Sequence, residues 1–359
     1  MKYYSSKKIN EKHAKYNVIF GERSNGKTYD ILKLGLEKYK KNGTQTAIIR
    51  RWKEDFKGKR GQEMYTNIVA NGELEKIFGS EWNTIFYYAG RWYLGRTEDG
   101  ELVQKALEPF AYAFALSDME HDKSVAYPRC DHIVFDEFLT RGAYLPDEFV
   151  LFMNVLSTII RKRTTAVIYM LGNTVNKYCP YFAEMGLSHV DKMKKGDIDV
   201  YNYGDSGLTV AVEYTDSLQK SKDADVYFAF DNPHLRMITG GDWEIDLYPH
   251  CPVKFKDSEI KFIYFVQFNN ALLQCEIIKQ KGIIFTFVHP KTTPLKNTDK
   301  DLIYTTEYDP RYNFSRNITK PKNEIEKLIY AMILNDKVFY SDNETGEVMR
   351  NYLKWCKTI

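Results

Sequence analysis

The stretch Gly21-Glu22-Arg23-Ser24-Asn25-Gly26-Lys27-Thr28 matches the pattern G-x-x-x-x-G-K-[ST] at every fixed position. In this pattern the glycines let successive backbone N–H groups point inward at phosphate oxygens, and the helix that follows adds the partial positive charge of its N-terminus. Lys27 would reach the β- and γ-phosphates, and the Thr28 hydroxyl would bind Mg²⁺. The eight residues therefore predict a nucleoside triphosphate site, against the alternative of a Gly- and Asn-rich turn before an ordinary helix.

The segments around this loop have the order strand, loop, helix. Residues 16–20 form a short apolar run that predicts a buried strand, and the apolar residues between 31 and 36 predict a helix. A hairpin is expected over 86–94. Further strands are expected at 46–49, 111–116, 132–135 and 166–171, and an amphipathic helix at 149–160. This alternation predicts an α/β fold with a mainly parallel sheet.

After residue 210 the pattern of the sequence changes. The polar stretch 216–223 is typical of a linker. Apolar runs at 261–268, 271–279 and 282–288 predict a meander of strands, and a helix is expected over 324–334. We therefore expect a P-loop ATPase domain at 1–212, a linker at 213–245 and a smaller domain at 246–359.

The composition favours a folded protein. The chain has 359 residues, enough for two cores, and its 43% hydrophobic and 15% aromatic residues argue against extended disorder. The five cysteines are scattered without a C-x-x-C pair, which is typical of free thiols in a reducing cytosol. No run approaches the ~20 apolar residues of a membrane span, and the N-terminus lacks the apolar core of a signal peptide. We expect a soluble, cytosolic protein without a membrane partner.

A second nucleotide motif follows the strand at 132–135. Phe135 is followed by Asp136 and Glu137. Asp136, at the end of the strand, would hold the Mg²⁺ shell. Glu137 could orient and deprotonate the attacking water, which favours hydrolysis over phosphoryl transfer to a small molecule. The alternative is an acidic pair that only marks the exit from a strand.

Asn173 follows the strand at 166–171, at the edge of the sheet where ligands bind in such folds. It could sense the γ-phosphate or hold the lytic water. An Asn that serves only the turn after Gly172 is an equal alternative.

Cationic residues cluster in the N-terminal domain. Residues 33–60 contain ten Lys and Arg against three acids, which indicates either a phosphate-binding surface or a solvated basic one. Arg161-Lys162-Arg163 ends the amphipathic helix, where cations also suit the helix C-terminus. We expect an arginine finger here for a neighbouring subunit's nucleotide, Arg161 first and Arg163 as the alternate. Further candidates for a phosphate contact in trans, or for contact with DNA, are Arg50, Arg51 and Lys53.

At these residues the sequence resembles the DNA-packaging ATPases of phi29-like tailed phages. These belong to the terminase-like branch of the additional-strand, catalytic-glutamate P-loop ATPases, whose first domain is RecA-like or terminase-like. The motifs match in order and approximate spacing over residues 16–180. The P-loop alone is generic, and the segments Arg50-Arg51-Trp52-Lys53 and Tyr127-Pro128 make the resemblance more specific.

The resemblance implies an ATP-driven motor that translocates double-stranded DNA into a preformed procapsid in the cytoplasm of a bacterial host. It implies a homomeric ring, a pentamer, docked on the phage portal, with a packaging RNA as a further partner. ATP and Mg²⁺ would be its ligands. Lys27 and Thr28 would bind the nucleotide, Asp136 the metal, Glu137 would be the catalytic base, and Arg161 the finger in trans.

The resemblance also implies a smaller α+β, RNase H-like C-terminal domain. A two-metal nuclease needs several carboxylates that converge on the ions. The strand at 262–268 carries no acid, Asn269 and Asn270 follow it, and Glu276 has no obvious acidic partner. We therefore expect an inactive nuclease fold that binds DNA, portal or RNA. Its candidate DNA contacts, for which surface charge is the alternative, are Lys254, Lys256, Lys261, Lys279 and Lys281.

Other classes of protein remain open on sequence grounds. The closest is a terminase large subunit with an active metal-dependent nuclease at its C-terminus. Another DNA-translocating ATPase, such as a helicase, or a phosphotransferase is a further alternative. A nucleotide-locked structural ring without turnover is disfavoured by the intact Lys27, Thr28, Asp136 and Glu137.

Overall fold

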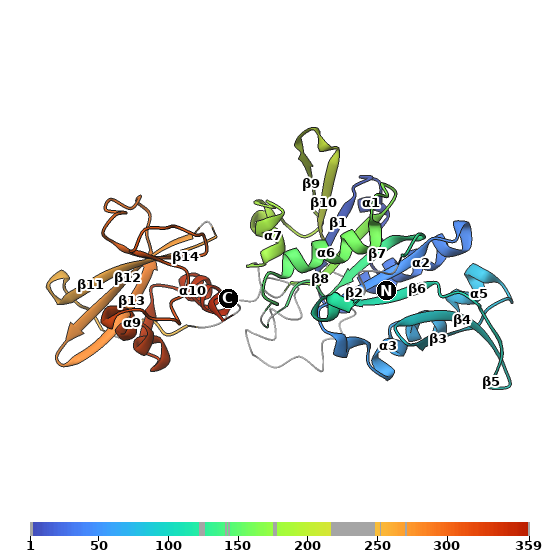
Figure 1. Cartoon of the computed structure of the whole chain (residues 1–359), viewed down its shortest axis with the longest axis horizontal. Coiled ribbons are helices and arrows are strands. Elements are labelled where there is room, and N and C mark those ends of the chain that lie inside the picture. The colour runs from blue at the N-terminus through green and yellow to red at the C-terminus, as the bar shows by residue number, and fades with distance from the viewer. Residues whose placement is uncertain are drawn as a thin grey trace. The chain divides into compact units, whose positions relative to one another are not determined.

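The computed structural model of the chain describes residues 3–121, 126–140, 142, 144–174, 178–216, 248–251, 253–269 and 271–357. The chain divides into two compact units (Figure 1). The first comprises Met1–Arg141 and Asp147–Glu244, and the second comprises Gly142–Pro146 and Ile245–Ile359.

The first unit is built on one large sheet with helices on both sides. Its strands are β1 (Tyr16–Gly21), β2 (Gln45–Arg50), β3 (Thr84–Tyr88), β4 (Arg91–Glu98), β5 (Glu101–Lys105), β6 (Ala111–Ala115), β7 (Cys130–Asp136), β8 (Val167–Asn173), β9 (Ile198–Tyr203) and β10 (Leu208–Tyr214). Its helices are α1 (Lys7–Asn10), α2 (Lys27–Asn42), α3 (Lys59–Glu63), α4 (Thr66–Ala70), α5 (Glu73–Phe78), α6 (Glu148–Ile160) and α7 (Pro180–Glu184). Short 3-10 turns are η1 (Lys53–Phe56), η2 (Leu116–His121), η3 (Val190–Lys192) and η4 (Gly204–Ser206).

The strand order of this sheet is β3-β4-β6-β2-β7-β8-β1-β10-β9, with β5 beside β4. From β6 to β10 along this order, neighbouring strands are parallel, and antiparallel strands extend both ends. β8 lies between the P-loop strand β1 and the acidic strand β7. The expected mainly parallel sheet is therefore confirmed, and one strand lies between the strands of the two motifs.

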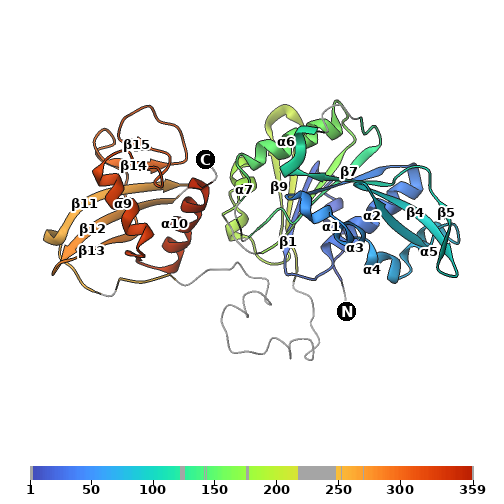
Figure 2. The same cartoon turned by 60° about the horizontal axis from the view of Figure 1, so that its bottom comes forward.

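The parallel strands are buried on both faces because α1 and α2 cover one side and α6 and α7 the other (Figures 1 and 2). Val134 of β7 lies in one apolar cluster with Ile31 of α2. The next residue, Phe135, points to the opposite face, where its ring centroid is 4.9 Å from that of Phe152 in α6. Such strands read as continuous apolar runs because both of their faces are buried.

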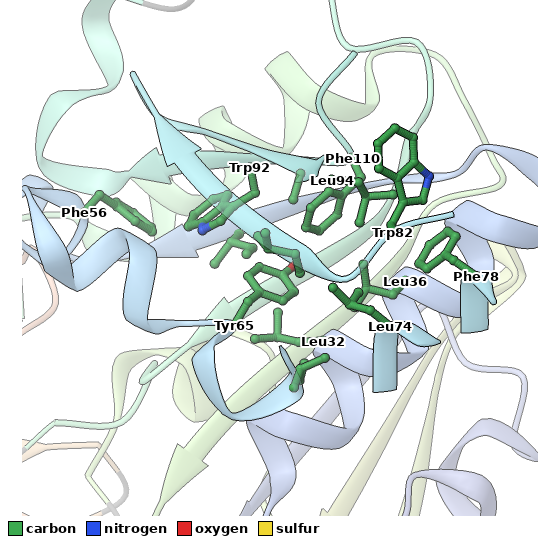
Figure 3. Packing of buried hydrophobic residues seen from close by; sticks show 14 residues of the cluster. Leu32, Leu36, Phe56, Tyr65, Leu74, Phe78, Trp82, Trp92, Leu94 and Phe110 are labelled. Atoms are coloured by element: carbon green, nitrogen blue, oxygen red, sulfur yellow. The ribbon is translucent and has the colours of Figure 1, made fainter. Parts of the chain in front are cut away.

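A second core lies between α2 and the β3–β4 hairpin (Figure 3). Leu32 and Leu36 supply the contribution of α2, and the large rings come from Tyr65, Trp92 and Phe110. The ring of Tyr65 meets those of Trp92 and Phe110 edge-on, at centroid distances of 5.9 and 5.2 Å. This cluster holds the segment of α3, α4 and α5 against the outer side of α2.

The β9–β10 hairpin was not predicted from the sequence. β10 pairs in parallel with β1, and Val210, Ala211 and Val212 are buried in the sheet. β10 continues to Tyr214, two residues past the expected domain end at 212. Most of the expected linker, residues 217–245 of 213–245, lies outside the described residues.

The second unit contains a smaller sheet of order β15-β14-β11-β12-β13-β16. Its strands are β11 (Ile260–Phe268), β12 (Ala271–Gln280), β13 (Ile283–Pro290), β14 (Leu302–Thr305), β15 (Phe314–Ser315) and β16 (Val338–Tyr340), and its helices are η6 (Asp257–Glu259), α9 (Glu324–Leu334) and α10 (Asn343–Cys356). The expected antiparallel meander is confirmed as β11, β12 and β13. β14 and β15 extend it in parallel on the β11 side. α10 was not predicted.

Within the described ranges, no helix combines the length and the apolar character needed to cross a lipid bilayer.

The second core of the first unit gives a stability prediction. Trp92 is fully buried and its indole N–H donates to the carbonyl of Gly61 at 2.8 Å. In Trp92→Phe this carbonyl loses its partner and a void opens among the rings, so we expect the free energy of unfolding of the first unit to fall by about 2 kcal/mol. Urea denaturation followed by circular dichroism measures this. Tyr88→Phe, on the same hairpin but 69% exposed, is the control and should change nothing; equal midpoints for Trp92→Phe and the wild type would contradict the prediction.

Candidate nucleotide site

The carboxyl ends of the parallel strands meet at one edge of the large sheet. The strand register pairs Gly21 with Asn173 and Asp136 with Leu171, so the P-loop, Asn173 and the acidic motif lie on neighbouring strands. A cavity of about 1030 Å³ opens at this edge. Its lining includes Ser24, Asn25, Gly26, Lys27, Thr28, Arg50, Asp136, Glu137 and Asn173, together with residues of the N-terminal segment and of α2, α4 and α5.

The P-loop folds as a tight turn ahead of α2. Gly26 is the residue before the helix and has a φ of 92°, a conformation that glycine adopts without steric cost. Glu22 and Asn25 are buried beneath the loop, whereas Arg23 and Ser24 are exposed. The N-terminus of a helix of 16 residues therefore faces the cavity, as anion binding requires.

The Lys27 side chain is held inside the loop. Its Nζ donates to the carbonyl of Glu22 at 2.6 Å, to Oδ1 of Asn25 at 3.1 Å and to Oδ1 of Asn173 at 3.4 Å. Burial lowers the pKa of Lys27 to about 8, although the charges of Asp136 and Glu22 act in the opposite direction. The ammonium is therefore short of compensating negative charge, which phosphate groups would supply.

Thr28 and Asp136, the two residues expected to bind magnesium, are in direct contact. The Thr28 hydroxyl donates to Oδ1 of Asp136 at 2.9 Å, and Asp136 is only 3% exposed. A hydroxyl and a carboxylate at the base of a phosphate cavity are the oxygen donors that Mg²⁺ prefers. The residues present therefore fit this ion.

Arg50 contacts both acids of the second motif in its own chain. One guanidinium nitrogen pairs with Asp136, and Nη1 lies 3.0 Å from Oε2 of Glu137. The sequence had offered Arg50 for a contact in trans or with DNA, and the structure places it inside the cavity of its own subunit. A cation beside both acids of the motif is thus supplied within the chain.

Arg51 and Lys53, the other two basic candidates near the end of β2, lie in different surroundings. The Arg51 side chain is only 6% exposed and pairs with Glu148 of α6. Lys53 is exposed and pairs with Asp118 of η2.

Arg161 and Arg163 lie at the opposite edge of the sheet. Arg163 donates to Asp131 Oδ1 at 2.7 Å and to the carbonyl of Cys130 at 2.9 Å, both at the start of β7. Arg161 is the exposed residue that ends α6. Because the P-loop lies at the carboxyl edge and these residues at the amino edge, Arg161 is not placed to reach the nucleotide of its own subunit.

The five candidate lysines of the second unit gather at one end of its sheet. The strand register brings the start of β11 beside the end of β12, and the carbonyl of Lys254 accepts a hydrogen bond from Gln280. Lys254, Lys256, Lys261, Lys279 and Lys281 are all exposed there.

Glu276 has neutral and basic neighbours rather than acidic ones. It accepts a hydrogen bond from Gln274 at 2.7 Å, and Nε2 of His289 lies 3.3 Å from it. Over the part of the chain that the structure describes, no three His, Cys, Asp or Glu side chains are arranged to hold a metal ion.

Sequence reasoning missed several residues that shape the site. Thr215, directly after β10, accepts a hydrogen bond from Asn25 at 3.0 Å, and a Cβ on Gly21 would lie 2.0 Å from its Oγ1. A Cβ on Gly172 would lie 2.9 Å from Phe138 and Leu139, so the turn after β7 rests on that glycine. These contacts join segments far apart in sequence, so no local pattern predicts them. Glu148, the partner of Arg51, is the exception, because a lone charge in an apolar helix is itself a signal.

The sequence matches the family described as podovirus DNA encapsidation protein (Gp16) over residues 1–345. It is 25% identical to the DNA packaging protein of Bacillus phage PZA over 360 residues, which cover 97% of this chain and 95% of that protein. It is 32% identical to the DNA packaging protein of Bacillus phage B103 over 174 residues, which are 48% of each chain.

A solved structure has a similar fold. The chain is similar to the structure of the Phi-28 gp11 DNA packaging motor, with a TM-score of 0.58, 18% sequence identity, and coverage of 99% of this chain and 98% of that one. The expected resemblance to the packaging ATPases of phi29-like phages is thus confirmed. The chain belongs to the podovirus DNA encapsidation protein (Gp16) family.

Proposed function

We propose that this chain is an ATPase that drives double-stranded DNA into a preformed procapsid, acting as a homomeric ring. The observation that carries the proposal is the convergence of Lys27, Thr28, Asp136 and Glu137 on one cavity, in a member of a DNA encapsidation family. The lysine and the helix N-terminus suit phosphate binding, and the second acid suits hydrolysis.

Phosphate binding would draw on groups that are already in place. When the β- and γ-phosphates enter the loop, Lys27 exchanges its contacts with Glu22 and Asn25 for phosphate oxygens. Thr28 and Asp136 would hold Mg²⁺, which neutralises charge on the phosphates when bound. Arg50 can transfer one of its contacts from the acids to the γ-phosphate.

Hydrolysis requires a base next to the γ-phosphate. Glu137 follows Asp136 and has an exposed side chain, so its carboxylate can accept a proton from an attacking water in the cavity. Asn173, 3.4 Å from Lys27 Nζ, is suited to hold that water or to contact the γ-phosphate.

The proposed ring places a second cation from the neighbouring subunit at each nucleotide. Arg161 is exposed at the edge of the sheet opposite the P-loop, so a head-to-tail contact would bring it to the next subunit's cavity. Arg163 is engaged with Asp131 and is the weaker candidate. A pentamer on the portal vertex, in the cytoplasm of the bacterial host, is the arrangement that we propose.

DNA contact is proposed for the lysine cluster of the second unit. The exposed lysines at the β11–β12 end form a local positive surface that suits phosphate backbones without regard to sequence. A packaging RNA would present phosphate groups to the same surface, as DNA does. The portal would have to present negative charge there.

The first test is steady-state ATP hydrolysis with and without long double-stranded DNA. We expect turnover that DNA stimulates, and a loss of at least ~10²-fold in kcat in Glu137→Gln, because the amide cannot accept the proton. Glu54→Gln, an exposed glutamate paired with Lys57, is the control and should retain full turnover. If wild-type protein on portal-bearing procapsids binds ATP but neither hydrolyses it nor packages DNA, the motor assignment fails.

Action of Arg161 in trans can be tested by mixing inactive subunits. Arg161→Ala removes the finger and should lower kcat by ~10³-fold or more. In rings that mix it with Glu137→Gln, some interfaces combine an intact base with an intact finger, so turnover should partly return. Arg163→Ala should keep its own turnover, because its Arg161 is intact. If Arg163→Ala is inactive instead and regains turnover when mixed with Glu137→Gln, while Arg161→Ala does not, the role passes to Arg163.

The lowered pKa of Lys27 predicts how nucleotide affinity depends on pH. Below about 8 the free protein already carries the charged lysine. Above that value, binding phosphates must restore a proton, so affinity for a non-hydrolysable ATP analogue should fall by up to about tenfold per pH unit. Calorimetric titrations in buffers of different ionisation enthalpy should record proton uptake at about pH 9. Lys27→Arg, which stays charged, should lose this pH dependence; a flat wild-type profile would contradict the assignment.

A further inference from the structure

We infer that Arg51 is a positioning residue for Glu137: through a buried contact with Glu148, it holds the backbone turn that carries the proposed catalytic base. The inference rests on the proposed ATPase function of the cavity. It assigns Arg51 a role inside its own subunit instead of a contact in trans or with DNA.

The anchor of this arrangement is a buried two-pronged ion pair. Arg51 Nε and Nη2 donate to the two carboxylate oxygens of Glu148 at 2.8 and 2.9 Å. The Glu148 side chain is fully buried, and Tyr181 also donates to it at 2.7 Å. Glu148 begins α6, where the helix N-terminus stabilises a carboxylate. Two parallel hydrogen bonds and a fixed acceptor leave the guanidinium a single orientation.

The remaining donors of Arg51 point at the turn after β7. Nη2 donates to the carbonyl of Phe138 at 2.8 Å, and Nη1 donates to the carbonyl of Glu137 at 3.3 Å. One guanidinium therefore links the start of α6 to the two peptide units that follow Asp136. The N–H of Phe138 is bound in turn by the carbonyl of Leu171 at 3.1 Å, which fixes the turn to β8.

This turn needs such support because Glu137 has an unfavourable backbone conformation. Its φ is 61°, in the left-handed region that residues with a Cβ seldom adopt. Such a conformation persists when surrounding contacts determine it, and it occurs often at functional sites. Here the contacts come from Arg51 and β8. They fix the backbone position from which the Glu137 side chain extends.

Arg50 and Arg51 thus act on the same turn in different ways. Arg50 contacts the side chains of Asp136 and Glu137 in the solvent-accessible cavity, where a ligand can replace it. Arg51 contacts the backbone from the protein interior and is 5% exposed. Its contacts do not need to change when the nucleotide arrives, so the backbone of Glu137 stays in place while its side chain is released.

The test uses Arg51→Lys in the full-length chain. Lysine keeps the charge, but it cannot bind both oxygens of Glu148 and two carbonyls at once. We expect kcat for ATP hydrolysis to fall by at least about tenfold, while the KM for ATP and the affinity for a non-hydrolysable analogue stay within about twofold. The wild type and Glu137→Gln are measured beside it: absent wild-type turnover would count against the ATPase proposal, not against this inference.

A control must separate positioning from plain loss of stability. Trp92→Phe lowers stability in the same unit at a residue that does not line the cavity, and it should leave kcat unchanged below its unfolding temperature. If Arg51→Lys lowers the unfolding temperature as much as Trp92→Phe does but leaves kcat at the wild-type value, Arg51 is only structural and the inference is wrong.

A second variant keeps the test decisive if Arg51→Lys does not fold. Tyr181→Phe removes only the hydroxyl that donates to Glu148 and leaves the ion pair intact. We expect a smaller fall in kcat, about two- to fivefold, with an unchanged KM. An unchanged kcat in folded Tyr181→Phe would overturn the inference in that case.

Discussion

The parallel register of β1, β8 and β7 sets how far the phosphate loop lies from the acidic motif. Gly21 pairs with Asn173, and Leu171 pairs with Asp136. The three strands therefore end at the same edge of the sheet. This register depends on apolar side chains buried on both faces, because a shift of one residue would turn each of them to the wrong side. The distance of 2.9 Å between Thr28 and Asp136 is a consequence of this sheet core.

Much of this site could be predicted because it follows from local sequence. A glycine loop between a strand and a helix, and two acids after an apolar strand, each define their structure within a few residues. The meander of the second unit followed from the same kind of pattern. β10 was missed although it is buried in the sheet, since its neighbour β1 is distant in sequence. The roles of Arg50 and Arg51 also could not be read from sequence, because each depends on a partner almost a hundred residues away.

The adjacent residues Arg50 and Arg51, at the end of β2, have different roles. Arg50 is the last residue of β2 and Arg51 is the first residue after it, and their side chains point in different directions. One enters the solvent-accessible cavity and the other the interior between β7 and α6. The sequence had grouped them as candidates for a phosphate contact in trans or for contact with DNA. Arg50 makes contacts in the cavity that a ligand can replace, whereas the buried contacts of Arg51 are permanent.

The contact between Gly21 and Thr215 changes what the glycine pattern means. A methyl group on Gly21 would overlap the Thr215 hydroxyl, which lies behind the loop and not on the phosphate side. The first position of the motif is therefore restricted to glycine by Thr215, which directly follows β10. The glycine pattern is used to recognise phosphate sites. At Gly21, however, glycine is required because two chain segments approach each other closely.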